Sequence, residues 1–466
     1  MHGRLWSCCS GIEGAWNRGS YTGPCMSYAT AIEQLSAMVP ELHTPGNQPR
    51  RKFSLEEVRV LLRALGDPHR KFPSVLIAGT NGKGSTAATL ASILTEAGLR
   101  AGLYISPHLI RVNERIRIGS DEIANEVFAR HYFRVREAAE KLAAQGQLPQ
   151  LPSYFEVLTA VAFSYFAESA VEIAVLEVGM GGRLDATNVV EPLLSVVTDI
   201  SLDHMEWLGP TVSAIAREKA GILRSNGVLV TLPQHPEANQ VLGEVAMELG
   251  VRGVNAAAYI PGAGSDTGYE LEVLGERVRI ASTLQGAHQH RNIALAIASA
   301  AELASRPEFQ QITARAVADG VARTRWPGRL EKITVWGHEW VLDVAHNSAG
   351  AWALRAGLHI AIRDMKDATL IFSCLRDKPV AELAQILFPL FGRVILAPIH
   401  SARATAMEDL KAAAEKTGVH AEMAASVEEA LRKAVAESAG PIVVSGSVYL
   451  VGEARSLLLG AREGAL

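Results

Sequence analysis

The segment with the most recognisable chemistry is residues 79–85, Gly-Thr-Asn-Gly-Lys-Gly-Ser, in which three glycines surround a lysine. An apolar run, residues 74–78, precedes it, and a helical pattern follows. A strand, a glycine loop and a helix can cradle phosphate, because glycine lets backbone N–H groups turn inward and the helix adds the positive end of its dipole. The match to the usual phosphate loop is imperfect, since Gly84 separates the lysine from the hydroxyl residue and Ile77 replaces the usual first glycine. The alternative is a tight turn with a surface lysine.

Polar side chains also follow two later apolar runs. Glu177 closes one run, and a glycine-rich stretch with Arg183 and Asp185 comes directly after it. Asp203 and His204 follow the next run. Ligands of open α/β sheets bind at the carboxyl ends of the strands. We therefore expect these side chains to lie near the glycine loop, where they could serve a charged substrate.

Three further candidates remain open when only the residues around them are considered. Ser106 and His108 lie on a loop interrupted by proline, which could equally be an ordinary polar loop. His204 beside a phosphate loop could bind a metal, although a single histidine is more often structural and Mg²⁺ prefers oxygen ligands. Lys219 lies in a charged helix end, where periodicity alone gives it no role.

The elements that would position these residues alternate between strand-like and helical patterns. Strand-like runs are Val75–Ala78, Arg100–Ile105, Val171–Val178, Leu193–Thr198 and Val228–Leu232, then Val341–Val344, Thr369–Phe372, Val394–Ala397 and Pro441–Val444. Helical patterns include residues 53–65 and 289–303, and residues 250–285 indicate irregular β structure with a hairpin of Tyr269–Val273 and Glu276–Ile280. This alternation predicts an α/β fold with a mostly parallel sheet covered on both faces.

The length of 466 residues predicts two or three domains. The strand and helix pattern restarts after a Trp-Pro-Gly-Arg segment, which predicts a boundary between residues 328 and 329. Residues 26–328 would form the phosphate-loop domain, and residues 329–466 a smaller α/β domain without a phosphate loop of its own. Residues 1–25 lack apolar periodicity, so we expect a disordered tail or an over-long reading of the gene.

Composition narrows the classes of partner. A net charge of −4 gives no reason to expect nucleic acid or an anionic membrane as a partner. The sequence has no apolar run of about 18 residues, so no membrane span is expected. The beginning of the chain lacks the apolar core of a signal peptide, and the four cysteines form no disulfide framework. We therefore expect a cytoplasmic location.

Taken together, the motifs resemble folylpolyglutamate synthase/dihydrofolate synthase, a branch of the Mur-ligase superfamily. The matching segments are GTNGKGS at 79–85, SPHL at 106–109, NERI at 113–116, SYFE at 153–156, EVGMGGRLDATN at 177–188, LDHMEWLG at 202–209, REKAGI at 217–222, HRN at 290–292, WPGR at 326–329 and DVAHN at 343–347. They follow the family's order across residues 27–455. The resemblance implies an N-terminal P-loop ATPase domain joined to a C-terminal Rossmann-like domain.

The family's chemistry is ATP-dependent amide formation. A carboxylate attacks the γ-phosphate of ATP, and the amine of glutamate then attacks the resulting acyl phosphate. The resemblance implies ATP, L-glutamate and dihydropteroate or reduced folates as partners, Mg²⁺ as cofactor, and a monomer. It leaves open whether the enzyme accepts dihydropteroate, folates or both, although bacterial members are often bifunctional. The departures are small: Ser85 and Met180 replace a frequent threonine and leucine.

The resemblance also implies roles for individual residues. ATP would be held by Gly82, Lys83, Gly84, Ser85, Asn292, Arg329 and Asp343; Mg²⁺ by Ser106, Glu177 and His204; and the pteroate group by Tyr154, Phe155, Leu184, Asp185 and Ala186. Lys83 and His346 would serve catalysis, and Lys219 would be the lysine that the family carboxylates to a carbamate. The simpler alternative is that Lys219 pairs with Glu218 or a helix C-terminus.

Two other functions compete with this interpretation. Another Mur-type amino-acid ligase would carry an extra N-terminal domain, but the phosphate loop begins only some fifty residues after Met26, which leaves too little chain for one. A P-loop ATPase that performs no ligation is the second competitor. The pteroate-type segments and the DVAHN segment at 343–347 argue against it.

Overall fold

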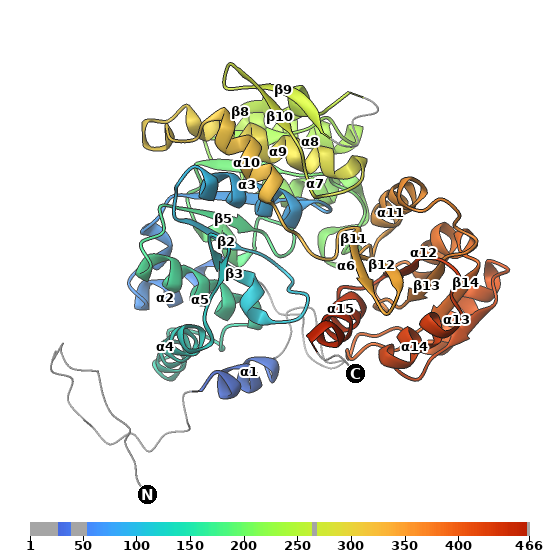
Figure 1. The fold of residues 1–466 in the computed structure, drawn as a ribbon. Coiled ribbons are helices and arrows are strands. Elements are labelled where there is room, and N and C mark those ends of the chain that lie inside the picture. Colours follow the sequence, from blue (N-terminus) through green and yellow to red (C-terminus); the bar gives the residue numbers. More distant parts are fainter. Residues whose placement is uncertain (1–26, 39–53, 263–267, 464–466) are drawn as a thin grey trace, which may run out of the picture.

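The computed structural model describes residues 27–38, 54–262 and 268–463. The expected tail over residues 1–25 lies outside the described residues. The structure contains two large sheets and a separate hairpin (Figure 1). Within the described ranges, no helix has both the length and the apolarity needed to cross a membrane.

The first sheet has eight strands in the order β4-β3-β2-β5-β1-β6-β7-β8. Their bounds are β1 Ser74–Ala78, β2 Ala101–Tyr104, β3 Ile116–Ile118, β4 Asp121–Glu122, β5 Ile173–Glu177, β6 Leu194–Val197, β7 Val228–Thr231 and β8 Arg252–Asn255. The strands from β2 to β8 in this order pair in parallel, whereas β3 and β4 pair antiparallel at one edge. The carboxyl ends of β1, β5 and β6 therefore lie side by side.

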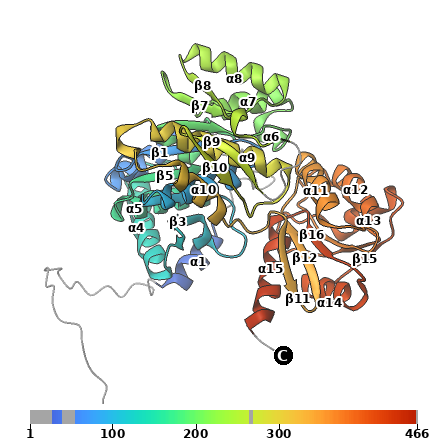
Figure 2. The ribbon, with the colours of Figure 1, turned by 45° about the horizontal axis from the view of Figure 1, so that its top comes forward.

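Alternating residues of β1 enter two different cores. Val75 and Ile77 pack with the helices on one face, and Leu76 and Ala78 pack with those on the other. The first group is α3 Lys83–Glu96, α9 Ala287–Ala304 and α10 Ala314–Arg323; the second is α1 Tyr28–Ser36, α2 Leu55–Ala64, α4 Asn125–Ala144, α5 Tyr154–Glu168, α7 Val212–Ala220 and α8 Pro236–Glu248. Both faces of this strand are thus buried, which explains its continuous apolar sequence. Figure 2 shows α7 and α8 beside β7 and β8, far from α4 and α5.

The second sheet has six strands in the order β11-β12-β16-β13-β14-β15. The bounds are β11 Glu331–Val335, β12 His338–Asp343, β13 Thr369–Phe372, β14 Arg393–Leu396, β15 Ala421–Met423 and β16 Ile442–Ser445. Helices α11 Ser348–Ala361, α12 Val380–Leu387 and α13 Met407–Lys416 cover one face, and α14 Val427–Glu437 and α15 Val448–Glu463 the other. Only β11 pairs antiparallel, so this too is a mostly parallel α/β sheet.

The predicted α/β fold class is confirmed, and so is the hairpin of β9 (Tyr269–Val273) and β10 (Glu276–Ile280). The predicted strands all occur, with ends shifted by a few residues. The strands that the sequence did not predict are β3, β4, β8, β11 and β15, all of which lie at or next to a sheet edge. Such strands are half exposed, so they carry polar residues and lack the apolar run that marks a buried strand.

Candidate active site

A cavity of about 360 Å³ lies where the carboxyl edge of the first sheet meets the loops of the second. Its lining includes the whole glycine loop (residues 79–85), Ser106, Glu177, His204, Lys219, Asn292, Arg329, Asp343 and His346. The structure thus brings together all the residues predicted for ATP, metal and catalysis. They come from segments spread over more than half of the chain.

The glycine loop joins β1 to α3, and its geometry depends on close packing. Gly82 has φ +90°, and a Cβ there would lie 2.9 Å from Cγ of Asn292 on α9. Only glycine therefore fits without strain. Lys83 begins α3, and its Nζ donates to the carbonyls of Gly79 at 3.0 Å and Thr80 at 3.2 Å. The lysine is thus held over its own loop, at the N-terminus of a helix, where an anion is favoured.

Two of the candidate metal ligands are joined directly. Glu177 ends β5, is 4% exposed and accepts the backbone N–H of Ser106 at 3.1 Å. Burial raises the pKa of this carboxyl, and the charge of Lys83 and the Ser106 bond oppose that rise. His204, which has φ +50°, precedes α6 (Met205–Leu208), and burial lowers its pKa to about 4, so the imidazole is neutral at pH 7.

Lys219 occupies the last turn of α7 and is 4% exposed. Its Nζ donates to the carbonyl of Gly79 at 2.8 Å. Burial, and next the nearby charge of Lys83, lower the pKa of this amine to about 7. Lys219 thus bonds Gly79 and not Glu218, whose carboxylate accepts Nη2 of Arg183 at 2.9 Å.

The residues predicted for ATP on the far side of the cavity come from three elements. Asn292 lies on α9 and donates to Gln289 at 2.9 Å. Asp343 ends β12, and its carboxylate accepts the backbone N–H groups of Leu330 and Ala345, each at 2.9 Å. Burial lowers the pKa of the Arg329 guanidinium, while the charges of Asp343 and Glu177 raise it. Arg329 is thus placed between carboxylates of the two sheets.

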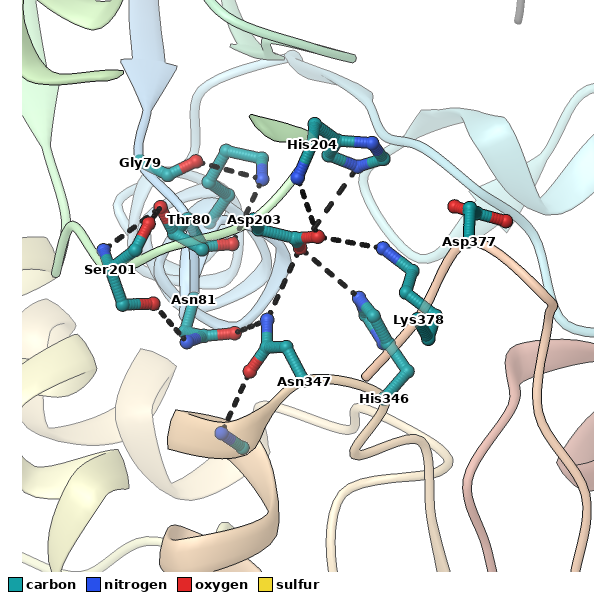
Figure 3. A network of polar contacts seen from close by, with 12 residues as sticks. Gly79, Thr80, Asn81, Ser201, Asp203, His204, His346, Asn347, Asp377 and Lys378 are labelled. Carbon is teal, nitrogen blue, oxygen red and sulfur yellow. Dashed lines mark hydrogen bonds and ion pairs between the residues drawn. The ribbon is translucent and has the colours of Figure 1, made fainter. Parts of the chain in front are cut away.

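Asp203 connects the two parts of the molecule (Figure 3). Its carboxylate accepts Nζ of Lys378 at 2.7 Å and Nδ2 of Asn347 at 3.2 Å, and Nε2 of His346 lies 3.7 Å away. Burial raises the pKa of Asp203, but the neighbouring His346 and the charge of Lys378 together hold it well below its usual range. Asp203 is therefore an anion enclosed by donors from the second sheet's loops.

The same network reaches the glycine loop. Nδ2 of Asn347 also donates to Oδ1 of Asn81 at 3.0 Å, and Asn81 in turn donates to the hydroxyl of Ser201 at 3.3 Å (Figure 3). Sequence reasoning assigned no role to Lys378, Asn347 or Asn81. For Asn347 the DVAHN segment was a usable signal, whereas Lys378 lies in a stretch with no recognisable motif.

A second, larger cavity of about 1000 Å³ lies on the other side of Asp203. Its lining includes Met205, Trp207, Trp352, Arg376, Lys378 and Arg403. Asp203 and His204 line both cavities. The Asp203 network therefore separates a phosphate-type cavity from one with aromatic and cationic side chains.

The residues predicted for the pteroate group lie elsewhere. The Phe155 ring packs against Tyr104 with centroids 5.8 Å apart, and the Arg115 guanidinium lies 5.4 Å from the Tyr154 ring centroid. Asp185 is buried and accepts the backbone N–H of Met180 at 3.0 Å, so it shapes its own loop. Leu184 is partly exposed and Ala186 is buried. Among the described residues that line the two cavities, none of these five occurs.

Comparisons with known proteins agree with this arrangement. Residues 77–300 match the Mur ligase middle domain, and residues 328–448 match the Mur ligase glutamate ligase domain. The chain is 33% identical over 452 residues to the folylpolyglutamate synthase of Lacticaseibacillus casei, covering 94% of this chain and 100% of the relative. It is 36% identical over 374 residues to the dihydrofolate synthase/folylpolyglutamate synthase of Bacillus subtilis, covering 78% and 85%.

Solved structures give the same result. The chain superposes with a TM-score of 0.79 on Mycobacterium tuberculosis folylpolyglutamate synthase complexed with ADP and AMPPCP, at 34% identity and covering 87% of this chain and 95% of that one. It superposes with the same TM-score of 0.79 on E. coli FolC in complex with DHPP and ADP, at 28% identity. This match covers 94% of this chain and 99% of that one. The chain therefore belongs to the folylpolyglutamate synthase/dihydrofolate synthase family of Mur ligases, which use ATP to add glutamate to folates.

Proposed function

We propose that this ATP-dependent ligase accepts both dihydropteroate and reduced folates and joins L-glutamate to each through an acyl phosphate. The observation that carries the proposal is a single cavity lined both by Lys83 of the glycine loop and by Arg329 and Asp343 of the second part of the chain. The relative from Bacillus subtilis, which is named for both activities, supports the dual specificity.

The first step transfers a phosphoryl group. The backbone N–H groups of the glycine loop receive the phosphates of ATP, and Lys83 exchanges its bond to Gly79 for a phosphate oxygen. The acceptor carboxylate attacks the γ-phosphorus, the bond to the β-phosphate oxygen breaks, and ADP leaves. Arg329, reaching in from the second part of the chain, offsets the negative charge that develops.

The residues present fit a divalent cation. Ser106 and Glu177 offer oxygens, His204 offers a neutral imidazole, and all three line the cavity. A buried carboxylate with a raised pKa gains from a neighbouring cation, which supports the fit. Within the described residues, no group of three His, Cys, Asp or Glu side chains could hold a metal ion, so the Ser106 hydroxyl and waters would have to complete the set. Mg²⁺ bound here would neutralise phosphate charge.

The second step needs an amine that has lost a proton. Nδ1 of His346 lies 2.9 Å from the carbonyl of Val344 and must donate to it, so in the neutral ring Nε2 is the basic nitrogen. This nitrogen lies 3.7 Å from the Asp203 carboxylate, so two hydrogen-bond acceptors, Nε2 of His346 and the carboxylate of Asp203, lie close together. An ammonium group satisfies both. We assign His346 to accept the proton of the glutamate amine before the amine attacks the acyl carbon and phosphate leaves.

The second cavity suits the incoming glutamate. Arg376 and Arg403 contribute guanidinium groups, which bind carboxylates through paired hydrogen bonds. Glutamate held there would present its amine toward Asp203, which lines both cavities, and toward His346, which lines the ATP cavity. The amine would then lie at the boundary between the two cavities, next to the cavity in which the acyl phosphate forms.

Lys219 is proposed to react with CO₂ and form a carbamate. Only the neutral amine attacks CO₂, and a pKa lowered to about 7 by burial and by Lys83 makes that form abundant at physiological pH. The carbamate would replace a cation near the metal site with an anion. A small free carboxylate such as formate could then substitute for it in a variant that lacks the lysine.

The remaining proposals rest on the family resemblance. We propose that residues 26–328 and 329–466 are separate domains, that the enzyme is a monomer, and that it acts in the cytoplasm. The Phe155 and Asp185 regions remain the proposed pteroate site, supported by their position beside the loop that follows β5.

ADP release tests the function. The purified enzyme is supplied with ATP, Mg²⁺ and L-glutamate, together with either dihydropteroate or a tetrahydrofolate, and the products are identified by mass. We expect ADP release and a mass gain of one glutamyl group with both acceptors. Activity with only one acceptor would contradict the dual specificity, and acceptor-independent ATP hydrolysis without a glutamylated product would contradict ligation.

A further inference from the structure

The loop that follows β5 closes directly on the last turn of α7. The backbone N–H of Arg183 donates to the carbonyl of Glu218 at 2.8 Å, and its Nε and Nη2 donate to the Glu218 carboxylate at 3.1 and 2.9 Å. The last four carbonyls of a helix have no partner within the helix. Arg183 thus satisfies one of these carbonyls, that of Glu218, and also binds the Glu218 side chain. Glu218 directly precedes Lys219.

Two glycines permit this contact. A Cβ on Gly182 would lie 2.8 Å from the carbonyl oxygen of Glu218 and 3.0 Å from that of Lys219. A Cβ on Gly221 would lie 2.6 Å from Cα of Arg183, although its φ of −63° suits any residue. The glycines are therefore needed for close approach, and any larger side chain would push the loop and the helix end apart.

The contact is reinforced and leads into the cavity. Nδ2 of Asn188 donates to the carbonyls of both Arg183 and Gly221, at 3.1 and 3.0 Å. Gly179 and Gly181 of the same loop line the ATP cavity together with Lys219. The loop therefore fixes the backbone of α7 at Lys219. From there the lysine side chain reaches into the cavity and donates to the Gly79 carbonyl at 2.8 Å.

We propose that Arg183 and Glu218 form a positioning pair for Lys219, which fixes the last turn of α7 so that the lysine side chain enters the cavity beside Gly79. The inference rests on the proposed function, in which Lys219 is carboxylated and active. Arg183 itself lies outside the cavity and acts only through the helix end.

The same helix offers a matched control pair. Nη2 of Arg217 binds Glu244 on α8 at 3.0 Å, and both arginine side chains, Arg183 and Arg217, are 55% exposed. Exposed ion pairs contribute little to stability, so losing either pair should lower Tm by a similar small amount. A difference in turnover between the two losses therefore reports positioning and not general stability.

The first experiment compares ligation by Arg183→Ala and Arg217→Ala, using ATP, glutamate and a tetrahydrofolate. We expect kcat to fall about tenfold in Arg183→Ala with an unchanged KM for ATP, since small misplacements of active groups are costly. Arg217→Ala should stay within about twofold of the parent. Equal effects of the two substitutions would overturn the proposal.

A double-mutant cycle shows whether Arg183 acts through Lys219. In a Lys219→Ala background supplied with formate, the free carboxylate is not attached to α7, so adding Arg183→Ala should cost less than about twofold. The same tenfold cost in both backgrounds would overturn the positioning role. By contrast, parent-like turnover of Lys219→Ala without formate would overturn the role of Lys219 in the proposed function itself.

A substitution in the backbone contact provides an independent test. Gly182→Ala adds one methyl group against the Glu218 carbonyl, and we expect it to lower kcat about as much as Arg183→Ala does. Gly243→Ala, on neighbouring α8 with open space around its Cβ, is the control and should keep parent activity. Parent-like kcat for a folded Gly182→Ala would contradict the inference.

Discussion

Lys83 and Lys219 both donate to the carbonyl of Gly79, at 3.0 and 2.8 Å, yet their surroundings suit different chemistry. Lys83 lies on the loop, at the start of α3, and can turn toward a phosphate. Lys219 is buried, and burial together with the charge of Lys83 lowers the pKa of its amine to about 7. The pair thus combines a cation for phosphate with an amine whose neutral form is abundant near pH 7.

Lys83→Ala should abolish ligation without unfolding the protein. The side chain bonds only loop carbonyls, so its loss removes phosphate stabilisation while the core stays intact. We expect kcat/KM to fall by about a thousandfold, and Tm to stay close to that of the exposed control Lys141→Ala. Near-normal turnover at saturating ATP would show that Lys83 does not serve the phosphates.

Lys219→Ala should lose most activity and regain part of it with formate or acetate. The added carboxylate replaces the proposed carbamate, whereas in Lys219→Arg the guanidinium keeps the cation and cannot form this carbamate. We expect Lys219→Arg to be inactive in the ADP-release assay with or without formate. Parent-like activity of Lys219→Arg would rule out the carbamate.

The lowered pKa of Lys219 also predicts a pH dependence of stability. At pH values between about 7 and 10.5 the unfolded chain holds the proton and the folded chain does not, so the stability of the parent rises with pH in this window. Lys219→Met has no such group, so its gain in Tm over the parent should be largest below pH 7 and shrink toward pH 10. Thermal melts of both proteins in CO₂-free buffer at several pH values measure the difference in Tm. A difference in Tm that stays constant with pH would contradict the prediction.

At the scale of elements, the glycine loop is fixed by the packing of α3 against α9. Gly82→Ala faces two costs, a φ of +90° and a clash with the Asn292 side chain. Gly98→Ala, at φ +83° with open space around its Cβ, isolates the first cost, which is about 1 kcal/mol. We expect Gly82→Ala to lower Tm several degrees more than Gly98→Ala and to raise the KM for ATP. Equal changes in Tm would show that the contact with α9 is unimportant.

At the scale of the whole molecule, the Asp203 network holds the two sheets' loops together. Lys378 is almost fully buried and binds Asp203 at 2.7 Å, so Lys378→Met leaves the carboxylate without its closest cation. Since an unpaired buried charge is costly, we expect the two parts of the chain to separate. Small-angle scattering in the presence of an ATP analogue and folate should then give a larger radius of gyration than for the parent.

A control distinguishes this effect from general destabilisation. Arg393→Met breaks an ion pair with Glu422 that lies wholly within the second part of the chain. It should leave the radius of gyration unchanged. If Lys378→Met and the parent compact equally on adding both ligands, the Asp203–Lys378 bond does not hold the closed arrangement.

The sequence by itself determined the order of strands and helices, the glycine loop and the polar segments at the carboxyl ends of β5 and β6. These follow from local patterns, because apolar periodicity and glycine spacing act over a few residues. The predicted hairpin of β9 and β10 is the same kind of success. The short strands β3, β4, β8, β11 and β15 escaped prediction because they lie at or next to a sheet edge, are partly exposed and lack the apolar run that marks a buried strand.

Only the tertiary structure showed how the distant segments meet. Asp203 and Lys378 are 175 positions apart, and nothing near Lys378 in the sequence points to a carboxylate partner. The contact of Gly182 with the end of α7 is equally invisible, since a glycine needed for close approach looks like a glycine needed for a turn. Packing decides which donors surround a buried charge and how far its pKa moves, because both depend on neighbours in space that local sequence patterns do not specify.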